Sequence, residues 1–150
     1  MSLNITNICH NIAALDVTGI NKICDLHEIP ESVVDRDCPL LYPNPEGFVS
    51  ELVITVDSFG SAEAAKTVTY LLTYRFLEAS LSTERGLFDL YGDFVKHVFA
   101  VLDKLIDSDA LAGLIDLQVE GITAFGPVTD PSGNGFHGCD LVLRIMEFVN

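Results

Sequence analysis

Hydrophobic and polar positions follow two different periods along this chain. Between Glu84 and Asp107, apolar residues recur at steps of three and four, and most charged residues fall opposite them. This spacing predicts a long amphipathic helix, because residues i, i+3, i+4 and i+7 share one helical face. Thr83 is the expected N-cap, and Glu84 lies in the expected first turn, where the helix dipole favours an anion. Gly92 costs a helix roughly 1 kcal/mol relative to Ala, which indicates a close approach by another element.

Other segments alternate with a period of two and are rich in Val, Thr and aromatic residues, which is typical of strands. They cover residues 48–57, 67–78, 114–125 and 139–149. Gly121 interrupts the third segment and predicts a bulge. The second segment is the clearest, and its apolar face consists of Val68, Tyr70, Leu72, Tyr74 and Phe76.

The remaining segments connect these elements. Residues 4–15 show helical spacing and predict a short amphipathic helix. Residues 28–47 hold four prolines and form a connector, within which the apolar segment Cys38–Pro43 is expected to pack on the domain as an ordered edge. Two long loops are expected, one at 58–66 and a glycine-rich one at 126–138.

The order of these elements predicts a single α+β domain over residues 1–150. We expect an antiparallel sheet of about four main strands, with the short N-terminal helix and the long central helix packed on one face. Apolar residues fall on both faces of the second strand segment. A sheet face that stays partly apolar when helices cover its back is a candidate contact surface for another subunit.

Composition narrows the functional classes. The formal net charge is −14, which argues against a protein that grips nucleic acid through its phosphates. No apolar run is long enough to span a membrane, and the start of the chain lacks the basic and apolar regions of a signal peptide. The four cysteines have no metal-ligand spacing, so we expect free thiols in a reducing compartment.

Catalytic motifs are missing from the sequence. His10, His27, His97 and His137 lie in four different segments, and none has a motif around it. The loop Asp130–Gly135 has some residues of a calcium loop but lacks the later carboxylates, so a turn is the better interpretation. We therefore expect no enzyme activity, no cofactor and no metal, and a protein that works by contact.

Several stretches together resemble a known family. They are the N-terminal helix, Ile29–Ser32 followed by Cys38–Pro43, the long hairpin ending with Thr69–Arg75, the central helix with Gly121–Ile122, and Phe136–Gly138 before the last strand. In this order they resemble the tail terminator and related tail-completion or neck proteins of long-tailed bacteriophages. The resemblance covers essentially the whole chain and rests on architecture.

The resemblance implies a structural virion protein at the head–tail junction, made in the host cytoplasm. Such proteins form a hexameric ring that caps the tail tube, ends its polymerisation and joins it to the head connector. The implied partners are further copies of the chain, the tail tube protein and the head–tail connector protein. DNA would pass through the lumen without specific binding, and an acidic lumen would let it slide. The same resemblance also fits another neck protein at the connector.

Contact residues are predicted by position alone. The first loop, around Asp57, Phe59 and Glu63, is the first candidate for a partner or subunit interface. The glycine-rich loop, around Asn134 and Phe136, is the second. Phe59 and Phe136 would be apolar residues at loop tips, where interfaces commonly form.

A small enzyme or ligand-binding domain of hot-dog type is the alternative from another class. In that fold a long helix is wrapped by an antiparallel sheet, and an acidic residue or histidine often lies near the start of the helix. Glu84 would be that residue here, although no partner motif accompanies it.

Overall fold

The structure of the protein is a computed structural model that describes residues 3–57, 65–107 and 115–149. Its helices are α1 (Ile5–Ala13) and α2 (Leu87–Ile106), and two short 3-10 turns cover Leu26–Glu28 and Asp35–Asp37. The strands are β1 (Lys22–Ile23), β2 (Leu40–Pro43), β3 (Val49–Asp57), β4 (Ala65–Ser80), β5 (Ile115–Thr129) and β6 (Gly135–Val149).

The strands form one six-stranded sheet in the order β1-β2-β4-β6-β5. Strand β3 pairs with the first half of β4, on the edge that β2 occupies further along. All pairs are antiparallel except β1 with β2. The α+β class with a mostly antiparallel sheet is confirmed. The expected count of about four strands was low, because β1 and β2 are too short to show a period in the sequence.

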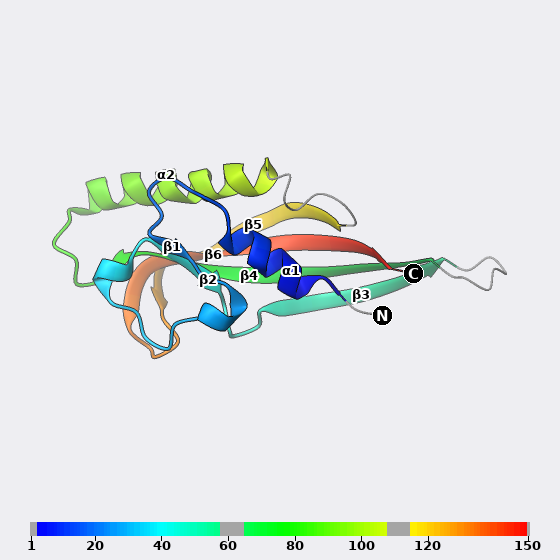
Figure 1. Cartoon of the computed structure of the whole chain (residues 1–150). Helices are drawn as coiled ribbons and strands as arrows, with labels where there is room; N and C mark the ends of the chain where they lie inside the picture. The colour runs from blue at the N-terminus through cyan, green and yellow to red at the C-terminus, as the bar shows by residue number, and fades with distance from the viewer. Residues whose placement is uncertain (1–2, 58–64, 108–114, 150) are drawn as a thin grey trace.

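Strand β4 lies at the centre of the sheet, and its inward face is the predicted one. Both helices pack on this face, since their apolar residues share one core with it, as Figure 1 shows for α2 along the sheet. Phe76 and Phe94 join β4 to α2 with ring centroids 5.7 Å apart. Members of this core that are almost fully buried are Ile8, Ile12, Val68, Tyr70, Leu72, Tyr74, Phe76, Phe94, Val98 and Val101.

The opposite face of the sheet is covered at one end only. There the connector between β1 and β2 and the curled ends of β5 and β6 enclose a second, smaller core. Towards the other end, Leu71, Val142 and Met146 on this face are only half-buried. The second core consists of Cys24, Val33, Leu40, Tyr42, Leu77, Val128 and Phe136.

A buried carboxylate fixes α1 to the sheet. Glu147 is 1% exposed and points inward from β6. It accepts a hydrogen bond from the Tyr70 hydroxyl at 2.5 Å and from the backbone N–H of Asn4 at 3.0 Å. Asn4 is the N-cap of α1 and has no side-chain cap of its own, so Glu147 serves the start of this helix from another element.

Two boundaries differ from the sequence prediction. Helix α2 begins at Leu87, after Gly86, because Thr83 Oγ1 accepts from the backbone N–H of Arg85 at 3.4 Å in a local turn.

The predicted loop at 126–138 is wrong, since β5 runs to Thr129 and β6 starts at Gly135. Pro127 is tolerated there because β5 is an edge strand. The bulge predicted at Gly121 is confirmed by a register shift between Val119 and Gly121.

Glu147→Ala is expected to lower the free energy of unfolding by about 1–3 kcal/mol, because the Tyr70 hydroxyl and the Asn4 N–H would lose a buried acceptor. The matched control is Glu120→Ala. Glu120 pairs with Arg144 in an exposed ion pair, which is worth about 0–1 kcal/mol. Urea unfolding of both variants checks this, and equal losses would contradict the role assigned to Glu147.

Candidate contact surfaces and buried polar sites

Strand β3 exposes apolar side chains on both of its faces. Val53 is 58% exposed, Ile54 46% and Val56 50%. These residues lie on the lateral edge of the sheet, where the helices do not reach: Ile54 pairs with Val68 of β4, which is fully buried, yet Ile54 stays exposed. We call Val49, Leu52, Val53, Ile54 and Val56 the β3 patch.

Among the described strands, none pairs with the outer edge of β3. A bulge between Ser50 and Val53, where Glu51 has a φ of 52°, disturbs the start of the strand. From Val53 to Asp57 the register with β4 is regular, and the sequence there contains no proline or lysine. Natural edge strands are usually protected by such residues or by bulges. This half of β3 therefore has the properties of a binding edge.

Strand β5 forms the opposite edge of the same sheet and differs in character. Register shifts occur between Val119 and Gly121 and between Thr123 and Gly126. These bulges reduce its capacity to pair with another strand. Phe125 is 45% exposed, and its ring stacks on Phe94 of α2 with centroids 4.3 Å apart. Exposed apolar surface thus occurs at both lateral edges of the sheet.

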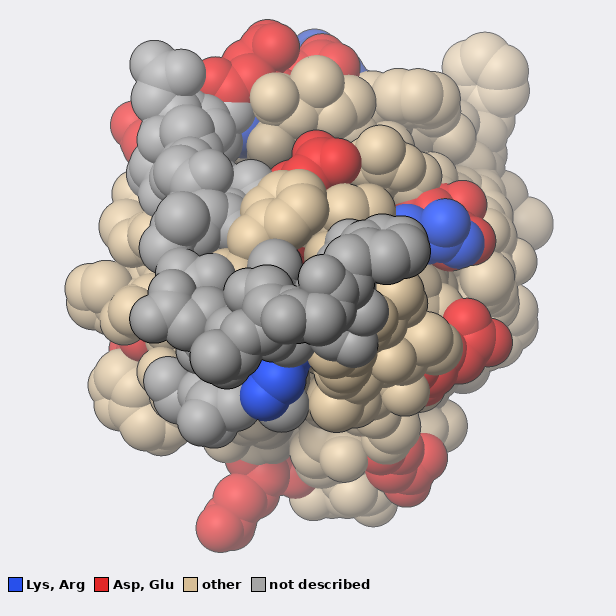
Figure 2. Space-filling model, turned by 90° about the vertical axis from the view of Figure 1, so that its right-hand side faces the viewer, with Lys and Arg blue, Asp and Glu red and all other residues tan. Residues whose placement is uncertain are grey.

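Acidic side chains outnumber basic ones at one end of the molecule. Figure 2 shows this end, towards which β3 and β4 project, with acidic side chains at more places than basic ones. This agrees with the formal net charge of −14. Such a surface repels phosphate groups at low ionic strength and is screened by salt.

Glu78 and His97 form a buried polar pair between β4 and α2. His97 Nδ1 lies 2.9 and 3.0 Å from the two carboxylate oxygens of Glu78, and Arg85 Nη1 lies 3.7 Å from one of them. Burial raises the pKa of the Glu78 carboxyl, while the His97 hydrogen bond opposes the shift. Gly19 covers the ring, since a Cβ there would come within 2.7 Å of His97. His97 is thus a core-edge residue.

No reactive thiol accompanies this pair. Cys38 is close enough for Glu78 to influence its titration, but burial raises the pKa of its thiol to about 12. Burial likewise raises the pKa of Cys24 to about 11 and of Cys139 to about 12. Thiols with such values are protonated near neutral pH and are poor nucleophiles. The arrangement holds elements together and has no group suited to covalent catalysis.

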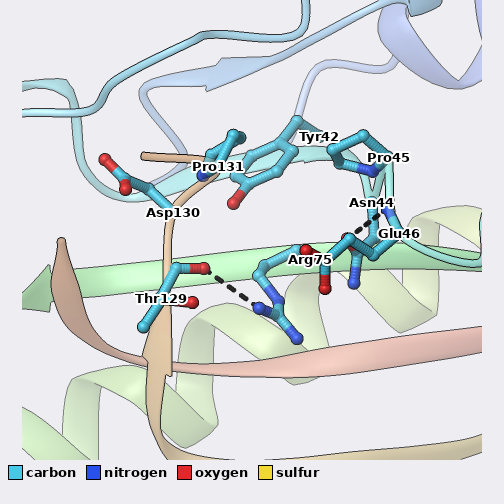
Figure 3. A pocket seen from close by; sticks show the side chains of 8 residues that line it. All are labelled: Tyr42, Asn44, Pro45, Glu46, Arg75, Thr129, Asp130 and Pro131. Carbon is cyan, nitrogen blue, oxygen red and sulfur yellow. Dashed lines mark hydrogen bonds between the residues drawn. The ribbon is translucent and has the colours of Figure 1, made fainter. Parts of the chain in front are cut away.

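A small pocket of about 260 Å³ opens at the end of β2, and Figure 3 shows its lining. Arg75 is the only cation among the lining residues, and its guanidinium group already has hydrogen-bond partners within the chain. Its Nε and Nη2 donate to the two carboxylate oxygens of Asp140 at 2.8 and 2.9 Å, and its Nη1 donates to the carbonyl of Thr129 at 3.0 Å. The lining residues are Tyr42, Asn44, Pro45, Glu46, Arg75, Thr129, Asp130 and Pro131.

Asp130 closes the β5–β6 turn, as the sequence predicted for this loop. Its carboxylate accepts from the backbone N–H groups of Ser132 and Asn134 and, across the molecule, from that of Val33 at 2.8 Å. Burial alone would raise its pKa, but the hydrogen bond from the Asn134 side-chain amide, together with these backbone hydrogen bonds, outweighs burial and lowers it. The carboxylate is therefore occupied by amide donors. Among the described residues no cluster of three or more potential ligands surrounds a metal position.

The predicted contact residues lie in different environments. Asp57 is the last residue of β3, while Phe59 and Glu63 lie outside the described residues. Asn134 is exposed in the β5–β6 turn, where its amide donates to Ser32 and Asp130. Phe136 was expected at a loop tip, and this was wrong: it is 2% exposed in the second core, because β6 begins one residue before it.

The residue required by the enzyme alternative is also placed differently from the prediction. Glu84 is exposed and lies before α2, outside its first turn. It therefore lies neither at the helix start nor in a shielded pocket, as the enzyme alternative would require.

Comparisons of the sequence with models of known protein families and with curated proteins found no match. Within the described part of the chain, no helix combines the length and apolar character needed to cross a bilayer.

Sequence reasoning missed the buried acids and the exposed apolar surfaces. The alternation within the strands could have predicted the buried acids. Glu78 lies two residues after the inward-facing Phe76, and Glu147 lies two residues after the inward-facing Ile145. For β3, alternation alone predicted one buried face. Burial there depends on how far the helices reach, which the period of a single strand does not encode.

The Glu78 pair predicts a pH-dependent stability difference between the wild type and Glu78→Gln. Because the folded pKa is raised above the ordinary 4.5, the unfolded chain loses this proton first as pH rises. The wild type should therefore lose stability relative to Glu78→Gln as pH increases above about 4.5 and through the folded pKa. Urea unfolding from pH 4 to pH 8 measures this difference, and a difference that stays constant over the range would contradict the assignment.

Proposed function

We propose that this protein is a structural virion protein at the head–tail junction of a long-tailed bacteriophage. In this proposal its copies form a ring, a hexamer above all, that caps the tail tube and ends its polymerisation. The ring then joins the tube to the head connector. A neck protein at the connector would use the same fold with different neighbours.

The observation that carries the proposal is the exposed apolar surface on the two opposite edges of one sheet. The β3 patch lies on one edge, and Ile122 and Phe125 lie on the other. A contact between two different patches of neighbouring copies is heterologous, and such contacts close into rings when the rotation allows it. Single exposed apolar residues are common, but a projecting, unprotected edge strand is a recognised site of association.

The charge and the chemistry of the chain support the same proposal. A ring around DNA benefits from an acidic lumen, since phosphates are repelled and no specific grip forms. The described polar clusters hold the fold together: Glu147 serves the start of α1, Glu78 pairs with His97, and Asp130 closes a turn. The exposed position of Glu84 gives no support to a hot-dog enzyme.

Val53→Lys tests the role of the β3 patch. Val53 is 58% exposed, so the monomer should lose little stability. If the patch joins copies, a buried unpaired charge should raise the dissociation constant of the oligomer at least about tenfold. Sedimentation velocity over a concentration series measures the assembly, and electron microscopy of tail tubes grown with the protein measures capping.

The matched control is Ser50→Lys, which adds the same charge on the same strand and the same sheet face outside the apolar patch. It should assemble and cap tubes as the wild type does. Equal loss in both variants, or no loss in either, would contradict the role of the β3 patch.

A further inference from the structure

Helix α2 has a second apolar face that its own chain leaves uncovered. Phe88 is 93% exposed, Val95 41%, Phe99 56% and Ile106 68%. With about 100° of rotation per residue, these four side chains fall within about 20° of one line along the helix. Most core-facing residues lie about a quarter turn or more away from that line, and Leu102, which also belongs to the core, lies about 40° from it. We call Phe88, Val95, Phe99 and Ile106 the α2 stripe.

Gly92 lies close to this same line, in the interior of α2. Glycine is among the most unfavourable residues at such a position, so its presence needs a reason. The sequence suggested a close approach by another element. In the described part of the chain nothing approaches it, because a Cβ built on Gly92 would meet no heavy atom within 4 Å. Within the described residues, Gly92 is therefore open to an approach by a second chain.

The spacing of the stripe identifies that element. Its members are separated by seven, four and seven residues, a series that reads the same in both directions. When the direction of the helix is reversed about position 97, position 88 exchanges with position 106 and position 95 with position 99. The stripe therefore coincides with itself. The same operation brings Phe99 and Asp103 of the second copy nearest to Gly92. A self-complementary surface of this kind is what a two-fold contact between identical chains requires.

We propose that α2 packs antiparallel against α2 of a second copy of this chain, forming a two-fold dimer. Phe88 then meets Ile106 of the second copy, and Val95 meets Phe99. This contact is separate from the ring contact and does not rest on it.

The exposed area of the stripe suits such a contact. From the exposed fractions and about 150–250 Å² per large side chain, it presents about 500 Å² of apolar surface. A stable interface buries about 800 Å² per partner, of which somewhat more than half is apolar. The stripe alone therefore supplies the apolar part of a standard interface, and it lies at the upper end of patch sizes found on monomers.

Charged residues beside the stripe repel one another in the dimer, and this repulsion makes dimer formation depend on the salt concentration. Antiparallel two-fold packing places each flank against the same flank of the second copy, so Asp89 approaches Asp103 of that copy, and the two Lys96 side chains approach each other near the axis. These residues are exposed, and salt screens such repulsion. The dimer should therefore become tighter as ionic strength rises.

Gly92→Leu is the decisive variant, measured by sedimentation equilibrium of the full chain. Leucine favours the helix, so the monomer should unfold at the same or higher urea concentration. The added side chain would project into the contact beside Phe99 of the second copy, so the dimer dissociation constant should rise at least about tenfold. Phe99→Asp should weaken the dimer at least as much, whereas Lys104→Ala, away from the stripe, should leave it unchanged.

The orientation is tested by disulfide formation in a mixture of Val95→Cys and Phe99→Cys proteins. Antiparallel packing predicts the mixed 95–99 disulfide in preference to either symmetric one, with the wild type as the control for its own cysteines. A wild type that stays monomeric, a dimer indifferent to Gly92→Leu and Phe99→Asp, or a preference for symmetric disulfides would each overturn the proposal. Loss of ring assembly in Val53→Lys leaves this result unaffected, so the two contacts can fail separately.

Discussion

The lateral reach of the helices across the sheet determines the rest of this structure. Both helices share one core with the central strand β4, whose inward side chains from Val68 to Phe76 are at most 1% exposed. Ile54 of the neighbouring strand β3 pairs with the fully buried Val68, yet it is 46% exposed. The helices therefore cover the centre of the sheet and leave β3 at its edge exposed on both faces. Exposed apolar surface is thus a consequence of the architecture.

Buried acids hold the covering elements in register with the sheet. Glu147 holds the start of α1, Glu78 holds α2 through His97, and Asp130 joins the β5–β6 turn to the connector at Val33. Each carboxylate belongs to a strand or a strand end and bonds to a segment distant in sequence. Because a buried carboxylate without partners is costly, each of these contacts also specifies one arrangement of the elements.

The sequence predicted the parts of the fold that depend on local periodicity. The inward face of β4, the existence of α2 and the bulge at Gly121 follow from residue spacing alone, and the structure agrees. The prediction failed where tertiary context overrides local signals. Pro127 and the glycines near it indicated a loop, yet an edge strand with bulges accommodates them.

The contact surfaces could be predicted only in part. Phe136 was assigned to a loop tip because the turn was placed too widely, and the β5–β6 hairpin buries it. The α2 stripe was present in the sequence, but its residues were counted together with the core-facing ones. Separating two apolar faces of one helix requires knowing where the sheet lies. For the same reason the exposure of β3 became visible only once the reach of the helices was known.

The measurement that tests the account most directly is native mass spectrometry of the full chain over a wide concentration range. The account predicts closed oligomers of discrete size, a hexamer above all, with dimers or paired rings where α2 also engages. A monomer at every concentration, or an unbounded series of sizes, would contradict the claim that the exposed edges of this sheet join copies of the chain into a ring.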